Sequence, residues 1–499
     1  MINAPVSRPS VLKRVAWAGV GCVAFGLLCG PGSGVAAGLG EQLNTQLLHG
    51  VRWSGRLGLY DFQRDHNLNQ PFPGNPTQDP NGGYDVGSVA IGGNIYAQTG
   101  QIYGLSAGLG YSFSEALQDK EDYNSNLVGP AGHYRTLNRA YAQYNWPGVR
   151  IRAGRQNMHT PFASDDQFAF IPRSFAGFSI SARPLDFATH RDRSVDPGEQ
   201  RIAPADYNND LLMPMSFHDQ RQDKPKWQVY FARMYKFESR SSSHFQDGNR
   251  YVPDTSGFYT LGTHARQSTA HGDYIAQLWH YNFNDTADLQ YVEAGYQLPA
   301  LAVSDGFDGI KPFIRLQYTH ESEAGQAKLG PIDADVYGAK LGVRSAHFGL
   351  SVVGHYSPTH EGSFRGGQVA HPYTDLSGLF YTDTMNDGVG DLGPGYGYGV
   401  RANVRATDEF SLFSRYIRYV ARYGQSHDFY DTSGPQGFAA NTPITHNQHS
   451  WGWDTGVTLS LSMISPVLEG FKLQDVLGVT DFEGSHRFYD NRLRLFYKF

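Results

Sequence analysis

Apolar and polar residues alternate along many stretches of this chain. In residues 105–113, the odd positions from Leu105 to Phe113 are apolar and the even positions are small or polar. Successive side chains of a strand point to opposite faces, so such a stretch has one apolar and one polar face. The strongest alternation predicts β-strands at 52–60, 105–113, 313–320, 337–344, 348–356, 400–405 and 453–461.

A weaker form of the same pattern adds further strands. These segments are 86–97, 136–146, 148–156, 175–184, 226–235, 258–266, 272–281, 289–298, 409–419 and 470–480. The last residues, 491–499, alternate as well: Leu493 and Leu495 share one face, and Arg492 and Arg494 share the other. The chain stops on Phe499, an aromatic end typical of outer-membrane barrels. Together the segments predict an all-β fold of about 18 strands.

The predicted connections alternate between short and long. The short ones fall at 98–101, 146–148, 345 and 407–408, and the long ones at 114–135, 157–174, 357–395 and 420–449. Outer-membrane barrels have short periplasmic turns and longer outer loops. We therefore expect a transmembrane antiparallel β-barrel with both ends in the periplasm. Residues 185–225 break this alternation, as a plug-like insertion or as a periplasmic loop.

The first 37 residues are expected to be a signal peptide. Three basic residues precede an apolar run at 15–28, and the small residues around Ala37 suit cleavage after that residue. The run is too short for a membrane-spanning helix. Both cysteines, Cys22 and Cys29, lie in this segment, so the mature domain 38–499 is expected to lack disulfides and thiolate chemistry.

Composition supports a barrel and narrows the possible partners. Aromatic residues make up 14% of the chain, with 31 Tyr and 58 Gly, and the mean hydropathy is −0.45. These values fit a polar inner face and a thin outer apolar band. The signal segment holds three of the 41 basic residues and none of the 47 acidic ones, so the mature net charge is −9 instead of −6. This balance disfavours nucleic acid as a partner.

Motifs on either side of the connection at 157–174 resemble those of a known family. They are Arg150-Ile151-Arg152-Ala153-Gly154-Arg155-Gln156, Thr160-Pro161-Phe162, Asp165-Asp166, Ile171-Pro172-Arg173-Ser174-Phe175-Ala176-Gly177, Arg183-Pro184-Leu185 and the Arg/Ser-rich stretch 236–243. This segment is similar to the strand, constriction loop and strand of the OprD family of substrate-specific outer-membrane channels. The likeness extends over essentially the whole mature chain. It departs at Gln167, where many members have Arg, and at the insertion 185–225.

The resemblance implies an 18-stranded channel for small water-soluble nutrients, often carboxylates, with an inward-folded loop and a ladder of basic residues. The loop residues it implies at the constriction are Thr160, Ser164, Asp165, Asp166, Gln167 and Arg173. The two aspartates could instead cap the backbone of the loop itself.

Alternation independently places basic side chains on the inner face of the barrel. They are Arg150, Arg152, Arg315, Lys340, Arg344, Arg401, Arg405, Arg415, Arg492 and Arg494. A spaced row of cations offers an anion several weak sites, and Arg matches a carboxylate bidentately. The alternative is that these residues pair with inward carboxylates such as Glu293 and Asp454 and only stabilise the wall.

No catalytic or cofactor motif stands out. The chain has no Gly-x-Ser-x-Gly elbow, and the 19 histidines show no metal-ligand spacing. Residues 386–391 resemble a calcium loop, but the pattern occurs once. We therefore expect no catalytic residue, no cofactor and no metal site. The alternatives are an outer-membrane barrel enzyme and a secreted all-β binding protein.

The expected partners follow from the barrel prediction. They are small polar solutes, anionic or zwitterionic, together with outer-membrane lipid and the barrel assembly machinery. The expected location is the outer membrane of a Gram-negative bacterium. Nothing in the pattern distinguishes a monomer from a homotrimer.

Overall fold

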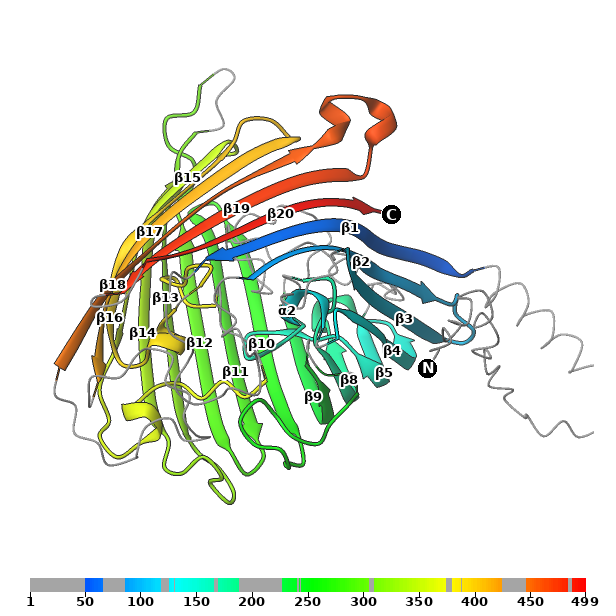
Figure 1. Cartoon of the computed structure of the whole chain (residues 1–499), viewed down its shortest axis with the longest axis horizontal. Helices are drawn as coiled ribbons and strands as arrows, with labels where there is room; N and C mark the ends of the chain where they lie inside the picture. The colour runs from blue at the N-terminus through cyan, green and yellow to red at the C-terminus, as the bar shows by residue number, and fades with distance from the viewer. Residues whose placement is uncertain are drawn as a thin grey trace, which may run out of the picture.

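The computed structural model shows a closed barrel of tilted strands (Figure 1). It describes residues 50–65, 86–117, 125–129, 131–165, 169–187, 227–239, 242, 244–304, 309–373, 379–386, 388–423, 446–482 and 487–499. The expected signal peptide, Asp166, Gln167 and nearly all of the insertion at 185–225 lie outside these residues.

In the described part of the chain, 18 strands form one antiparallel sheet. The strands are β1 (Arg52–Asp65), β2 (Val86–Gln98), β3 (Leu105–Ala116), β4 (His133–Trp146), β5 (Val149–Gln156), β8 (Ser174–Ala182), β9 (Trp227–Glu238), β10 (Phe258–Thr269), β11 (Gly272–Phe283), β12 (Ala287–Gln297), β13 (Lys311–Glu323), β14 (Asp333–Arg344), β15 (Phe348–Ser357), β16 (Gly395–Arg405), β17 (Phe410–Tyr423), β18 (His446–Ser460), β19 (Phe471–Phe482) and β20 (Phe488–Lys498).

Shorter elements lie between these strands. They are the hairpin β6 (His159–Thr160) and β7 (Ala163–Ser164), the α-helical turns α2 (Ser125–Val128) and α3 (Val389–Leu392), and the 3₁₀ turns η3 (Pro184–Asp186), η4 (Phe364–Gly366), η5 (Leu461–Met463) and η6 (Pro466–Leu468). Among the described residues, no helix is long and apolar enough to cross a membrane.

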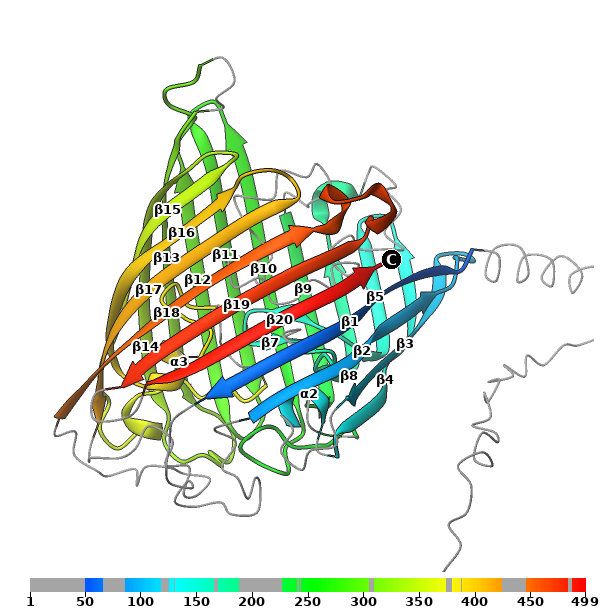
Figure 2. The same cartoon turned by 45° about the horizontal axis from the view of Figure 1, so that its top comes forward.

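The first and last strands close the barrel. Figure 2 shows β1 and β20 side by side, and their register runs from Arg56 opposite Lys498 to Asp65 opposite Tyr489. Beyond the register, the Gly55 N–H donates to the Phe499 carbonyl at 3.0 Å, and the Phe499 N–H donates back at 3.2 Å. A Cβ at Gly55 would lie 2.5 Å from the Asn94 carbonyl oxygen, so this position needs glycine. Closure pairs the backbone groups that an edge strand would leave free.

All 18 predicted strands are confirmed, with boundaries that differ by a few residues. Most strands extend beyond the alternating segment because backbone pairing continues into polar residues. β17, for example, runs on to Tyr423 and pairs with His446 of β18.

The two ends of the barrel differ in their connections. We call the end with the connections 117–132, 157–173 and 358–394 the loop end, and the opposite end the turn end. Some connections depart from the predicted alternation, among them the long turn-end connection at 298–310. Residues 284–286 form a short turn at the loop end, and residues 461–470, which contain η5 and η6, form a longer connection at the turn end.

The two faces of the wall differ as the alternation predicts. On the outer face, the apolar side chains of Leu316, Leu341 and Val352 are 53%, 51% and 54% exposed. On the inner face, the neighbouring Arg315 and Lys340 are buried. These two cations therefore face the interior of the barrel, where the internal loops also lie.

Candidate functional site

Several connections at the loop end pack against the inner wall, and we call two of them internal loops. The first internal loop comprises residues 157–173, between β5 and β8, and contains β6 and β7. The second internal loop comprises residues 358–394, between β15 and β16, and contains η4 and α3. Both contribute buried apolar side chains to one cluster with inward residues of the wall, for example Phe162 and Phe380 with Tyr291.

The first internal loop reaches two separated parts of the wall. Phe162 packs edge-on against Tyr281 and Tyr291 of β11 and β12, with ring centroids 5.8 and 5.7 Å apart. At the other end of the loop, Phe170 stacks on Tyr60 of β1 with centroids 4.0 Å apart. Asn94 of β2 donates from its amide to the Phe170 carbonyl at 2.8 Å. The loop therefore spans the interior instead of following one wall.

The described residues predicted at the constriction are buried within this loop. Thr160 donates from its hydroxyl to the Ala163 carbonyl at 2.8 Å, which closes the β6–β7 hairpin. The Asp165 carboxylate lies 3.2 Å from Nδ1 of His159, and its carbonyl accepts the Arg173 N–H at 2.7 Å. Ser164, Asp165 and Arg173 are each less than 10% exposed. These contacts stabilise the loop, and a direct role at the constriction stays a prediction.

The second internal loop is held along the inner wall by hydrogen bonds to buried carboxylates. The Tyr381 hydroxyl donates to Oε1 of Glu293 on β12 at 2.6 Å. Further along, the Met385 N–H donates to Oδ2 of Asp454 on β18 at 2.7 Å. Burial and the neighbouring Glu293 carboxylate raise the pKa of Tyr381 well above its ordinary value. The Tyr381 hydroxyl therefore remains a donor to Glu293 at any physiological pH.

The two internal loops meet each other inside the barrel. Phe162 of the first loop and Phe380 of the second have ring centroids 6.3 Å apart in an edge-on arrangement. The sequence predicted the length of the second loop but not its inward path. Its apolar residues, such as Leu379 and Phe380, are a signal that could have been used, because a fully hydrated outer loop would leave them exposed.

Arg315, Arg415 and Arg492, among the predicted wall cations, pair with carboxylates in the described part of the chain. Arg315 contacts Glu293, and both side chains are 1% exposed. Arg415 Nε lies 2.5 Å from Asp454 Oδ2, and Arg492 Nη2 lies 2.8 Å from Asp490 Oδ2. For these three arginines, the structure shows the contacts of the wall-stabilising alternative.

Other predicted cations donate to neutral oxygens. Arg152 donates to Oε1 of Gln143 at 3.0 Å, and Arg344 donates to Oε1 of Gln297. Arg494 donates to Oε1 of Gln474 at 3.0 Å, and its guanidinium lies 5.2 Å from the Phe62 ring centroid. Arg401 donates to the Tyr381 carbonyl at 3.1 Å. These contacts hold the guanidinium groups in fixed orientations on the inner wall.

The remaining predicted cations differ in exposure. Arg150 and Lys340 are buried on the inner face, and Lys340 Nζ lies 5.9 Å from the Phe313 ring centroid. Arg405 is exposed, near the turn end of β16.

Arg56 and Arg139 are two of the buried arginines that were absent from the prediction. Arg56 donates to the Ala169 carbonyl of the first internal loop at 2.9 Å. The Arg139 guanidinium lies 3.7 Å from the Tyr96 ring centroid. Arg56 lies on the polar face of the predicted strand 52–60, so the alternation rule could have identified it.

The fold is similar to that of several solved bacterial proteins. Pseudomonas aeruginosa OccK9 (OpdG) matches with a TM-score of 0.65 and 15% identity, over 91% of this chain and 99% of that chain. P. aeruginosa OpdK, solved with vanillate, matches with a TM-score of 0.62 and 15% identity, over 91% of this chain and 99% of that chain. A BenF-like porin from Pseudomonas fluorescens Pf-5 matches with a TM-score of 0.62 and 14% identity, over 90% of this chain and 98% of that chain.

These similarities cover nearly the whole barrel and agree with the sequence resemblance at the level of the fold. The chain therefore has the 18-stranded barrel fold of these proteins. No family model and no curated protein matches the chain.

Proposed function

We propose that this protein is a channel of the OprD type that lets small water-soluble carboxylates diffuse passively across the outer membrane. The observation that carries the proposal is the set of arginines that line the inner wall and contact the internal loops. Arg152, Arg344 and Arg494 donate to Gln side chains, and Arg56 and Arg401 donate to backbone carbonyls of the internal loops. These hydrogen bonds fix the positions of the basic side chains, and a wall lined by several cations attracts anions.

Two further features support this proposal. The internal loops narrow the interior, so a solute must pass close to the basic wall, where charges interact more strongly than in bulk water. The similar protein OpdK was solved with vanillate, an aromatic carboxylate. Several spaced cations would allow capture at one position and release to the next.

The proposal also includes the export of the protein, its insertion into the membrane and the residues of the constriction. Residues 1–37 would direct export, and the barrel assembly machinery would insert the mature domain into the outer membrane of a Gram-negative bacterium. No catalytic step is assigned to the protein, because an open diffusion path needs none. Thr160, Ser164, Asp165 and Arg173 would shape the constriction through the fold of the first internal loop.

Charge selectivity tests the basic wall. Changing Arg401 and Arg405 together to Gln keeps hydrogen-bonding groups but removes two positive charges from one inner face of β16. We expect the anion preference measured by reversal potential in planar bilayers to fall. Carboxylate flux should drop roughly tenfold for each 1.4 kcal/mol of attraction lost.

The matched control removes two charges elsewhere. Arg135 and Arg487 are 65% and 51% exposed and pair with Glu115 and Asp481. Changing both to Gln should leave the reversal potential nearly unchanged. Equal effects of the two double variants would show that net charge, and not the interior wall, sets the selectivity.

A further inference from the structure

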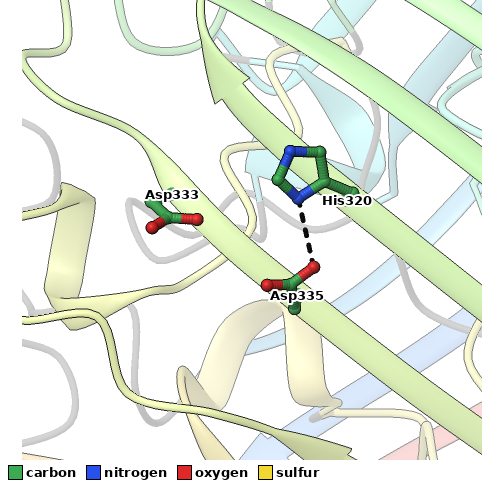
Figure 3. Close-up of side chains that lie close together, drawn as sticks. All are labelled: His320, Asp333 and Asp335. Atoms are coloured by element: carbon green, nitrogen blue, oxygen red, sulfur yellow. Dashed lines mark hydrogen bonds and ion pairs between the residues drawn. The ribbon is translucent and has the colours of Figure 1, made fainter.

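Histidine and aspartate side chains meet on the outer face of the wall near the loop end. Figure 3 shows His320 of β13 hydrogen-bonded to Asp335 of β14, with Asp333 close by on the same strand. His320 and Asp335 are register partners, and Nδ1 of His320 lies 3.1 Å from Oδ1 of Asp335. One ligand atom from each of the three residues lies within 4.8 Å of the others.

A second histidine closes the cluster. His360, at the start of the second internal loop, lies with Nδ1 2.9 Å from Oδ2 of Asp333 and Nε2 3.4 Å from Oδ2 of Asp335. His360 thus contacts both aspartates from a third segment of the chain, through a different ring nitrogen for each. We call His320, Asp333, Asp335 and His360 the rim cluster.

The rim cluster lies outside the channel interior. On the same strands, the neighbouring Glu321 and Ala334 are fully buried on the inner face, whereas His320 is 37% exposed. The next outward residues, Tyr318 and Tyr337, have ring centroids 5.0 Å apart, as in the aromatic girdle of a membrane barrel. The cluster therefore lies on the loop-end side of this tyrosine pair. An ion could reach it from outside the barrel without passing through the channel.

The spacing within the rim cluster suits a transition metal. In tetrahedral Zn²⁺ sites, His nitrogen and carboxylate oxygen lie about 2.0–2.2 Å from the metal, which places neighbouring ligand atoms about 3.3 Å apart. The His320 separation from Oδ1 of Asp335, 3.1 Å, and the His360 separation from Oδ2 of Asp335, 3.4 Å, are close to this value. Asp333 is 54% exposed, so its side chain has room to rotate toward the same centre.

We propose that the rim cluster binds one divalent transition-metal ion, Zn²⁺ in preference to Ca²⁺ or Mg²⁺. His320, Asp335 and Asp333 supply three ligands, and His360 supplies the fourth. Two imidazole nitrogens favour Zn²⁺, whereas Ca²⁺ and Mg²⁺ prefer sites made of oxygen alone. A bound ion would join the β13–β14 wall to the start of the second internal loop.

Metal titration of the purified barrel tests this proposal. The protein, prepared without a polyhistidine tag and stripped with a chelator, is titrated with Zn²⁺ by calorimetry and with Co²⁺ by visible absorption. We expect one Zn²⁺ site, a Co²⁺ spectrum of tetrahedral type, and no binding of Ca²⁺ at the same concentration. His320→Gln and Asp335→Asn should each weaken Zn²⁺ binding by about tenfold or more.

A neighbouring pair provides the matched control. His280 on β11 and Asp288 on β12 form a similar pair, with Nδ1 and Oδ1 3.5 Å apart. These two residues do not belong to the group formed by His320, Asp333 and Asp335. His280→Gln should leave Zn²⁺ affinity unchanged. The proposal is overturned if wild type binds no Zn²⁺, if His320→Gln binds as tightly as wild type, or if His280→Gln weakens binding equally. Heat-modifiable gel mobility shows which variants are folded, and His320→Gln decides the outcome if Asp335→Asn fails to fold.

Discussion

Replacing residues 361–392 of the second internal loop by a short Gly-Ser linker should raise the single-channel conductance several-fold. The loop occupies the interior between β12 and β18, where Tyr381 contacts Glu293 and Met385 contacts Asp454. Ser357 and Gly395 are register partners in β15 and β16, so a short turn can close this hairpin. Planar-bilayer recording of the refolded variant measures the change.

A deletion at the turn end controls for general loosening of the barrel. Residues 463–468 include Ile464 and Val467, which are 67% and 88% exposed. Removing them should leave the conductance unchanged. If the shortened second loop gives a folded barrel of wild-type conductance, that loop does not narrow the path.

Changing Arg315 to Met should lower the free energy of unfolding by about 3–5 kcal/mol, because it leaves the buried Glu293 carboxylate without its cation. Both side chains are 1% exposed, so water cannot replace the lost contact. Glu293 also accepts the Tyr381 hydroxyl, and the second internal loop should therefore loosen as well. Urea unfolding in lipid vesicles measures the loss.

Two controls test whether the loss of stability comes from the unpaired buried charge. Changing Glu293 to Gln in the Arg315→Met background removes the unpaired charge and should restore most of the stability. Arg135 and Glu115 form a pair 3.3 Å apart that is largely exposed, so Arg135→Met should cost no more than about 1 kcal/mol. A similar loss in both single Arg variants would mean that the Arg315–Glu293 pair is not effectively buried.

The strands were predictable because their signal is local. Most wall strands alternate between outward apolar and inward polar or small residues, so a window of eight or nine residues contains most of the pattern. The path of the second internal loop could not be predicted, because its contacts join residues far apart in the sequence. Tyr381 and Glu293 are 88 positions apart, and Met385 and Asp454 are 69 positions apart. No periodic pattern in the loop encodes those contacts.

The candidate site was predictable only in part, for a related reason. Alternation shows which cations share a strand face, but the partner of each cation depends on strand register. Arg315 and Arg415 pair with Glu293 and Asp454, whereas Arg401 donates to a loop carbonyl that the sequence did not place in the interior. The same limit applies to the rim cluster, whose His320 and Asp335 are 15 residues apart and meet only across β13 and β14.

Tracer uptake into liposomes that contain the purified protein tests the proposed channel most directly. Gluconate and sorbitol are open-chain molecules of nearly equal size, and only gluconate carries a carboxylate. We expect both to enter through the protein, gluconate faster than sorbitol, and neither to enter liposomes made with heat-denatured protein. Uptake of neither solute would contradict the channel, and sorbitol entering as fast as gluconate would contradict selection of carboxylates by the basic wall.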